Sequence, residues 1–114
     1  MTEIADNLAE KHCEACEGGV KPLTREEAER YIGKIAPDWT LSDDAKTISR
    51  DFEFKGFYKT VAFVNAIAWM ANHEGHHPDL EVGYGHCLVK WTTHAIDGLS
   101  ENDFICAART DKIF

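Results

Sequence analysis

The apolar residues of this chain switch repeatedly between helical spacing and strand spacing, so the fold must combine both kinds of element. Thr24, with Glu27 three positions later, forms a capping box and predicts the start of a helix that Pro37 ends. Residues 47–54 then follow a period of two, which is typical of a half-buried strand. A shorter partner strand is expected over residues 39–42.

A second helix and a hairpin follow in the sequence. Residues 56–73 return to helical spacing, with an apolar arc wide enough to need cover on more than one side. Gly75 and Pro78 end this helix, because glycine suits the position after a helix and proline cannot continue one. Two strands of a hairpin are then expected over residues 80–84 and 86–93.

The last element is a helix from Ser100 to about Lys112. Ser100 and Asp103 form a second capping box, and Leu99 and Phe104 have the spacing of a hydrophobic staple. The complete order is helix, strand, strand, helix, strand, strand, helix. The expected fold class is therefore α+β, with a four-stranded antiparallel sheet and helices packed on one face.

The length of 114 residues allows one domain. Residues 1–22 show no sustained period and predict a flexible leader, and residues 23–114 are expected to form the domain. The 12 basic against 20 acidic residues give a net charge of -8, which argues against nucleic acid or an anionic membrane as a partner. No apolar window is long enough for a membrane span, and the acidic N-terminus lacks the layout of a secretory signal. We therefore expect a cytoplasmic protein with free thiols.

Five of the six histidines lie within residues 73–94. Histidine titrates near neutral pH, so this cluster points to acid–base chemistry. Residues 73–77 also match the H-E-x-x-H signature of zinc hydrolases. That signature needs both end histidines on one face of a continuous helix, and Gly75 with Pro78 interrupts the helix here. Zinc hydrolysis is the less favoured alternative.

Cys13 and Cys16 form a C-x-x-C arrangement directly after His12. This is half of a zinc knuckle, and a structural zinc site needs a second close pair. Cys87 and Cys106 do not form one, and no strand–helix–strand context supports a thioredoxin-type motif. We expect two solvent-facing thiols and no metal.

Four separated segments share a further pattern. It consists of an adjacent His-His-Pro, an aromatic residue soon after it, a histidine at the end of a later strand, and an aspartate that opens the last helix. In this chain the pattern is formed by His76, His77, Pro78, Tyr84, His94 and Asp103. With Trp39 and residues 52–57, it closely resembles the pterin-4a-carbinolamine dehydratase family over about residues 24–113. One departure is Asn72, where the family often has an acidic residue, and Glu74 is the nearby carboxylate that could supply the charge.

The resemblance implies dehydration of 4a-hydroxytetrahydropterin to quinonoid dihydropterin, a hydro-lyase reaction. This reaction recycles the tetrahydropterin cofactor of aromatic amino acid hydroxylases and links the chain functionally to phenylalanine hydroxylase. The resemblance assigns His77 and His94 as the acid–base pair, and His76 as the residue that binds substrate and stabilises the departing hydroxyl. Such a reaction requires no metal and no cofactor.

Three further residues are assigned to binding or orientation of the substrate. The resemblance places Asp103 near His94 as an orienting carboxylate, and Asp103 also has the local role of a capping residue. Pro78 follows the histidine pair, and Trp39 resembles a tryptophan at the edge of the substrate pocket. A plain core role for Trp39 is an equally weighted alternative.

Self-association is also expected. The wide apolar arc of residues 57–71 fits a homodimer or homotetramer. Some members of the family also act as dimerisation partners of a transcription factor, so a coactivator-type binding protein is the alternative function. The three histidines at catalytic spacing favour the enzyme.

Overall fold

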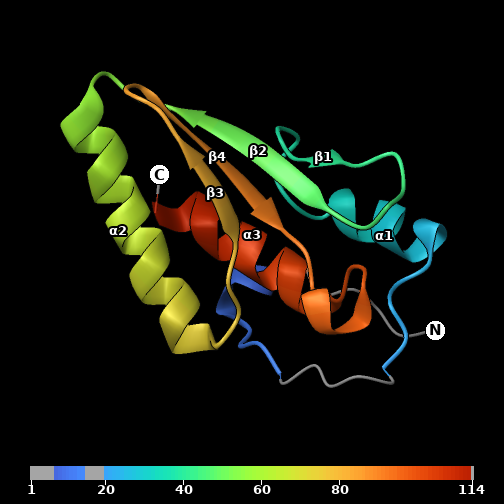
Figure 1. Cartoon of the computed structure of the whole chain (residues 1–114). Coiled ribbons are helices and arrows are strands. Elements are labelled where there is room, and N and C mark those ends of the chain that lie inside the picture. The colour runs from blue at the N-terminus through green and yellow to red at the C-terminus, as the bar shows by residue number, and fades with distance from the viewer. Residues whose placement is uncertain (1–6, 15–19, 114) are drawn as a thin grey trace.

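The computed structural model describes residues 7–14 and 20–113. Helices and strands alternate along these residues in the order that the sequence predicts (Figure 1). The elements are η1 (Leu8–Glu10), α1 (Arg25–Ile32), β1 (Thr40–Leu41), β2 (Ile48–Glu53), α2 (Phe57–Glu74), β3 (Asp79–Val82), β4 (His86–Trp91), η2 (His94–Ile96) and α3 (Glu101–Ile113). No helix among the described residues is both long and apolar enough to cross a membrane.

The N-terminal capping signal at Thr24 is confirmed. The side-chain oxygen of Thr24 accepts from the Glu27 N–H at 3.2 Å, and the Glu27 carboxylate accepts from the Thr24 N–H at 2.8 Å. Both contacts satisfy donors that the first turn of a helix leaves free. α1 ends at Ile32, before Pro37.

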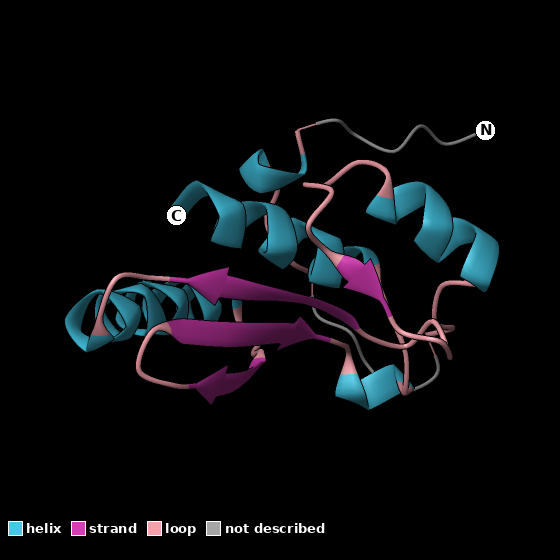
Figure 2. Ribbon diagram, turned by 90° about the horizontal axis from the view of Figure 1, so that it is seen from above, coloured by secondary structure: helices cyan, strands magenta, loops and turns pink. Residues whose placement is uncertain are grey.

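The four strands form one antiparallel sheet in the order β1-β2-β4-β3. Opposite residues of β2 and β4 share a face, and the pairs Phe52–Cys87 and Ile48–Trp91 are all buried. Side chains of all three α-helices join the core on this buried face, as the fold class predicts. Figure 2 shows α1 and α3 on one side of the strands. Alternate residues such as Asp51 point to the other face and are exposed, so the core lies on one side of the sheet.

The end of α2 determines where the histidine pair lies. Gly75 adopts the left-handed conformation, with φ 67° and ψ 26°, a conformation that glycine accepts without the steric cost of a Cβ. Its N–H donates to the carbonyls of Ala71 and Asn72 and closes the helix. His76 and His77 therefore lie outside the helix, in the short connection to β3.

Residues 7–14, which we call the N-terminal strap, pack on the domain, whereas the sequence predicted a flexible leader for residues 1–22. The side chain of Leu8 is buried in the core with α3 residues such as Ala107. The side chain of Arg109 donates to the carbonyl of Lys11 at 2.9 Å. No periodic pattern in the sequence indicates this contact, because it depends on residues at the opposite end of the chain. Residues 1–6 and 15–19 of the predicted leader lie outside the described residues.

Candidate active site

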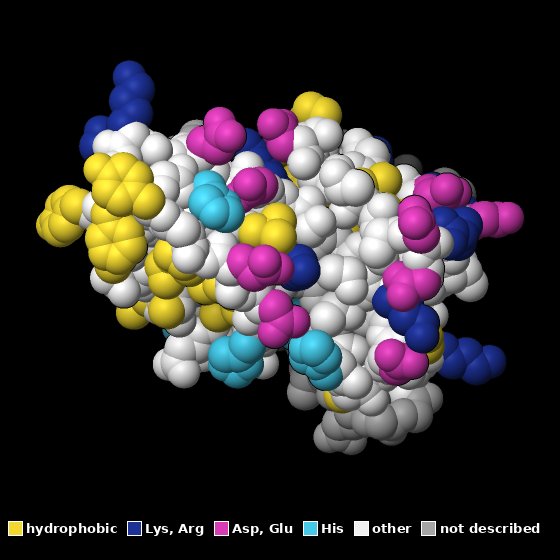
Figure 3. All heavy atoms as spheres, turned by 45° about the horizontal axis from the view of Figure 1, so that its top comes forward, with side chains coloured by type: hydrophobic (Ala, Val, Ile, Leu, Met, Phe, Trp, Pro, Cys, Tyr) yellow, Lys and Arg dark blue, Asp and Glu magenta, His cyan; other side chains and the backbone are white. Residues whose placement is uncertain are grey.

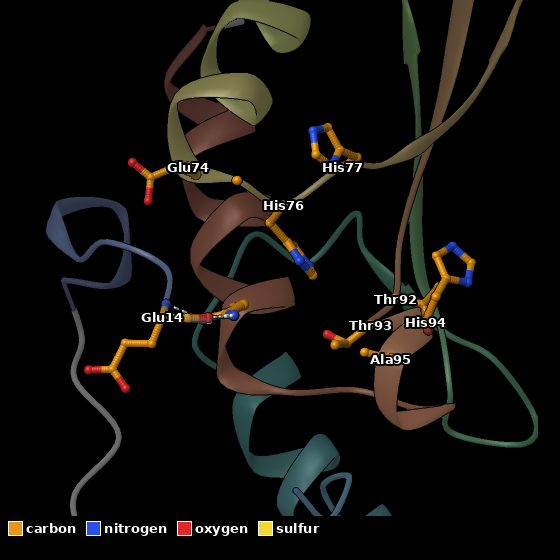
Figure 4. A pocket seen from close by; sticks show the side chains of 10 residues that line it. Glu14, Glu74, His76, His77, Thr92, Thr93, His94 and Ala95 are labelled. Carbon is orange, nitrogen blue, oxygen red and sulfur yellow. Dashed lines mark hydrogen bonds between the residues drawn. The ribbon is translucent and has the colours of Figure 1, made fainter. Parts of the chain in front are cut away.

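A cavity of about 420 Å³ lies where the end of α2, the segment after β4 and the start of α3 meet (Figure 4). It is lined by Glu14, Glu74, Gly75, His76, His77, Thr92, Thr93, His94, Ala95 and Asn102. The structure therefore brings the three histidines with predicted roles to one cavity. They reach it from two segments, because η2 begins at His94 directly after the sheet.

His76 is the most buried of the three histidines, with a side chain that is 12% exposed. Its Nε2–H donates to Oδ1 of Asp103 at 2.6 Å. Its ring stacks on the indole of Trp91, with centroids 5.6 Å apart and planes 9° apart. The hydrogen bond and the stack together fix both the position and the tilt of the imidazole.

Asp103 is fully buried and uses both carboxylate oxygens. Oδ2 accepts from the hydroxyl of Thr93 at 2.8 Å and from the backbone N–H of Ser100 at 2.9 Å. The Ser100 contact is the capping interaction that the sequence predicted, and it places a negative charge in the first turn of α3, where the helix dipole favours it. Three donors compensate the desolvation of this buried carboxylate.

The partner of Asp103 differs from the predicted one. The sequence pattern placed Asp103 near His94, but in the structure the carboxylate binds His76. His94 has a side chain that is 73% exposed, and its Nε2 lies 3.6 Å from Oδ2 of Asp79. The difference arises because Asp103 is buried where it caps its helix, while the His94 side chain is largely exposed.

His77 lines the same cavity and is exposed. No hydrogen bond holds its ring among the described residues, so its imidazole is available to a bound molecule. Pro78 does not line the cavity and leads directly into β3. Its effect is on the backbone, since proline cannot extend the helix that ends before Gly75.

Trp39 lies in the core and does not line the cavity. Its indole is 4% exposed and donates to both carboxylate oxygens of Asp111, at 2.9 and 3.1 Å. The ring also packs edge-on against Phe52 with centroids 6.0 Å apart. This arrangement corresponds to the core alternative for Trp39 and places it apart from the histidines of this chain's cavity.

Glu74 is the carboxylate that could supply the charge absent at Asn72, and it lines the cavity. Its carboxylate accepts from the Cys13 N–H at 2.7 Å and from His12 at 3.0 Å, and so it binds the strap. Burial raises the pKa of Glu74, but the contacts with Cys13, His12 and the nearby Arg109 outweigh burial and hold this pKa below its ordinary value. Glu74 therefore acts as an anchor for the strap at the rim of the cavity.

The H-E-x-x-H match does not form a zinc-hydrolase motif. His73 lies in the last turn of α2 and stacks on Trp69, with centroids 5.3 Å apart, while His77 lies beyond the left-handed Gly75. His73 instead forms a group with His12 and Glu74, whose potential ligand atoms all lie within 4.8 Å of one another. Arg109 lies next to this group, with its Nη2 3.3 Å from Nδ1 of His12. The positive charge of the guanidinium disfavours the binding of a cation there.

Sequence reasoning assigned no role in the site to several residues that the structure places at it. Trp91 and Thr93 both lie on the strand predicted over residues 86–93, and only the fold shows that they hold His76 and Asp103. Glu14 and Asn102 form a wall of the cavity, with the Glu14 N–H donating to Oδ1 of Asn102 at 3.0 Å. In a strand, every second side chain points to the same face, and this rule could have indicated that Trp91 and Thr93 both face the core.

Comparison with known proteins places the chain in a family. The family model described as pterin 4 alpha carbinolamine dehydratase matches residues 21–113. A relative from Nitrosomonas eutropha is 56% identical over 113 residues, which covers 99% of this chain and 97% of the relative. A relative from Legionella pneumophila is 51% identical over 110 residues, which covers 96% of this chain and 97% of the relative. The names of both relatives assign pterin-4-alpha-carbinolamine dehydratase activity provisionally.

Solved structures share the fold. A crystal structure of a transcriptional coactivator/pterin dehydratase from Brucella melitensis matches with a TM-score of 0.76 and 28% identity, covering 82% of this chain and 98% of that chain. A pterin dehydratase-like protein identified as a RuBisCO assembly factor in the alpha-carboxysome matches with a TM-score of 0.58 and 22% identity, covering 67% of this chain and 88% of that chain, which shows the fold alone. From the family model and these relatives, the chain belongs to the pterin-4-alpha-carbinolamine dehydratase family.

Proposed function

We propose that this chain dehydrates 4a-hydroxytetrahydropterin to quinonoid dihydropterin by acid–base catalysis with histidines. The single observation that carries the proposal is the His76–Asp103 hydrogen bond at the wall of a cavity that also contains His77 and His94. The arrangement combines one oriented imidazole with two imidazoles that have room to approach a substrate. The family to which the chain belongs supports the choice of substrate class.

The reaction breaks the C4a–O bond and removes a proton from a ring nitrogen, so that one water molecule leaves. It needs one group that takes the proton and one that protonates the departing hydroxyl. His77 and His94 are proposed for these two roles because both line the cavity and neither is locked by a short hydrogen bond. Imidazoles suit them, since acid–base efficiency is greatest when the catalytic pKa lies near the working pH.

His76 is proposed to bind the substrate and to stabilise the departing hydroxyl. A carboxylate accepts hydrogen bonds, so the contact with Asp103 places a proton on Nε2 and leaves Nδ1 as the second polar atom of the ring. Asp103 is a positioning residue in this scheme, because it acts through His76.

The test is a coupled assay with phenylalanine hydroxylase and limiting tetrahydropterin, in which decay of the 4a-hydroxy intermediate is followed by absorbance. Addition of the protein should accelerate the decay, and His77→Ala should lower this acceleration about 10²- to 10⁴-fold. His86→Ala is the matched control, since His86 is exposed on β4 and pairs with Asp51 away from the cavity. A chelator is added in a parallel reaction.

The outcomes separate the alternatives. Acceleration that needs His77 and ignores the chelator supports a metal-free dehydratase. An unchanged rate with His77→Ala would contradict the role of His77, and no acceleration by the wild-type protein would contradict the enzyme as a whole. Activity that the chelator removes would favour the zinc alternative.

Self-association is a second proposed property, supported by an exposed aromatic surface on α2 and the hairpin. It includes Phe57, Tyr58, Trp69 and Tyr84, of which Tyr58 is 86% and Trp69 is 71% exposed. Apolar side chains gather at this end of the molecule, on the left in Figure 3. Exposed apolar area of this kind is typical of an interface. Sedimentation equilibrium should give a homodimer or homotetramer that Trp69→Lys weakens, and a wild-type monomer at all concentrations would contradict this proposal.

A further inference from the structure

The N-terminal strap brings a second chemically reactive pair next to the histidine cavity. Sγ of Cys13 lies 3.4 Å from Sγ of Cys106, although the two residues are 93 positions apart in the sequence. We propose that Cys13 and Cys106 are an oxidation site, at which a peroxide converts the two thiols to a disulfide that ties the strap to α3. This inference does not depend on the proposed dehydratase activity.

Hydrogen bonds on the flanking backbone hold Cys13 in place. The N–H of Cys13 donates to Glu74 at 2.7 Å, and the N–H of the following Glu14 donates to Asn102 at 3.0 Å. The carbonyl of Lys11 accepts from the side chain of Arg109 at 2.9 Å. The strap is thus bound to α2 and α3 on both sides of the thiol, and closure to the S–S distance of about 2.05 Å requires only a local approach of the two side chains.

The two thiols differ in their access to an oxidant. Cys106 is fully buried in α3, and the hydrogen bond with Cys13 together with burial raises its pKa. Cys13 is partly exposed, so it is the thiol that meets peroxide. Cys13 attacks one peroxide oxygen and becomes a sulfenic acid as water leaves, and Cys106 then attacks the Cys13 sulfur and a second water leaves. Two thiols and one hydrogen peroxide give one disulfide and two water molecules.

The disulfide would act on the wall of the cavity. Glu14 follows Cys13 directly, and Asn102 lies one turn before Cys106 on α3, and both line the cavity with the histidines. A covalent link between these segments fixes that wall, whereas in the reduced protein hydrogen bonds alone hold it. The site therefore couples oxidation to the stability of one side of the cavity.

The experiment uses the full chain, first reduced and then treated with a small excess of hydrogen peroxide. Cys13 and Cys16 have no lysine or arginine between them and remain in one tryptic peptide, so Cys16→Ser is made to identify the linked residue. Wild-type protein and Cys16→Ser should both give a peptide linked to the Cys106 peptide, which dithiothreitol separates. Cys87→Ser is the matched control and should leave the link intact, since Cys87 is buried in β4 and burial raises its pKa to about 11.

Three results would overturn the proposal. They are a Cys13–Cys16 disulfide as the only wild-type product, oxidation of Cys13 to sulfinic acid without any link in Cys16→Ser, and no reaction of Cys13. These results are read from peptide masses in proteins that keep both cysteines, so they do not require a Cys106 variant to fold. Their outcome is independent of the dehydratase assay.

A second measurement tests the effect on the strap. The disulfide closes a long loop, so the oxidised Cys16→Ser protein should melt at least about 5 °C above its reduced form. The amide of Glu14 should also exchange with solvent more slowly after oxidation. Equal melting temperatures and equal exchange rates in the two forms would show that the link does not fix the wall.

Discussion

Nε2 of His76 lies 2.6 Å from Oδ1 of Asp103, and the Asp103 side chain has no exposed surface. Oδ2 of the same carboxylate accepts hydrogen bonds from the Thr93 hydroxyl and from the Ser100 N–H at the start of α3. The carboxylate thus links the cavity histidine to the strand and helix of the core. The position of His76 is therefore determined by the same group that caps the last helix. Changes in this network should affect stability and catalysis in separable ways.

Asp103→Asn should lower kcat of the proposed dehydration by about 10²- to 10⁴-fold with a smaller change in KM. The amide removes the negative charge that holds the His76 imidazole in position, so the ring is less well oriented toward the substrate. Asp111→Asn is the control, since Asp111 binds Trp39 and Arg50 away from the cavity. An Asp103→Asn enzyme with an unaltered kcat, or with KM raised and kcat unchanged, would contradict a positioning role.

Thr93→Val should lower the free energy of unfolding by about 1.5–3 kcal/mol, because it removes a hydroxyl donor from a buried carboxylate without changing the side-chain shape. Thr110→Val is a matched control in the same core. Its hydroxyl donates at 2.7 Å to the carbonyl of Cys106, four residues earlier in α3, and the variant should cost less than about 1 kcal/mol. Urea unfolding measures both values. If the two variants lose the same free energy of unfolding, the hydrogen bond from Thr93 to the buried Asp103 carboxylate stabilises the protein no more than an ordinary neutral hydrogen bond.

Glu74→Gln should release the strap and lower the free energy of unfolding at pH 7 by about 1.5–3 kcal/mol, the usual range for hydrogen bonds to a charged group. Contacts with Cys13, His12 and Arg109 outweigh burial and lower the pKa of Glu74 in the folded protein. Its stabilising contribution is thus fully present above the unfolded value of about 4.3 and is lost as the pH falls through the folded value.

The difference in stability between wild type and Glu74→Gln should therefore shrink as the pH is lowered below about 4.3. Urea unfolding at a series of pH values between neutral and acid measures it. Glu53→Gln, at an exposed position of β2, serves as the control and should show no such convergence. A difference that stays constant with pH would argue against the ionised Glu74 as the anchor of the strap.

Gly75→Ala should cost about 1 kcal/mol of stability, since a Cβ is strained at φ 67°. It should also lower dehydratase activity, because the end of α2 sets the direction of the chain toward His76. Gly75→Asn should be milder, as asparagine tolerates the left-handed conformation. Gly33→Ala, at φ -71°, tests a glycine of ordinary helical conformation and should be neutral or slightly stabilising. Urea unfolding measures these stabilities. Equal free energies of unfolding for Gly75→Ala and Gly33→Ala would contradict the prediction.

Much of the fold follows from local patterns in the sequence. The Thr24–Glu27 capping box begins α1, and the change of spacing after Phe54 separates β2 from α2. Gly75 and Pro78 end α2 where the sequence predicted. These features were predictable because capping, helix termination and amphipathic spacing depend on residues within a few positions of one another. The clustering of His76, His77 and His94 was also visible in the sequence.

The tertiary structure alone decided which partners these residues have. Asp103 binds His76, 27 positions away, instead of His94, and Trp39 donates to Asp111 in the core. The strap contacts residues that are far from it in the sequence, as in the Cys13–Cys106 pair, whose members are 93 positions apart. The sequence determined the elements because their signals are local. It did not determine these contacts, because they depend on how the sheet and helices pack together, which no short-range pattern encodes.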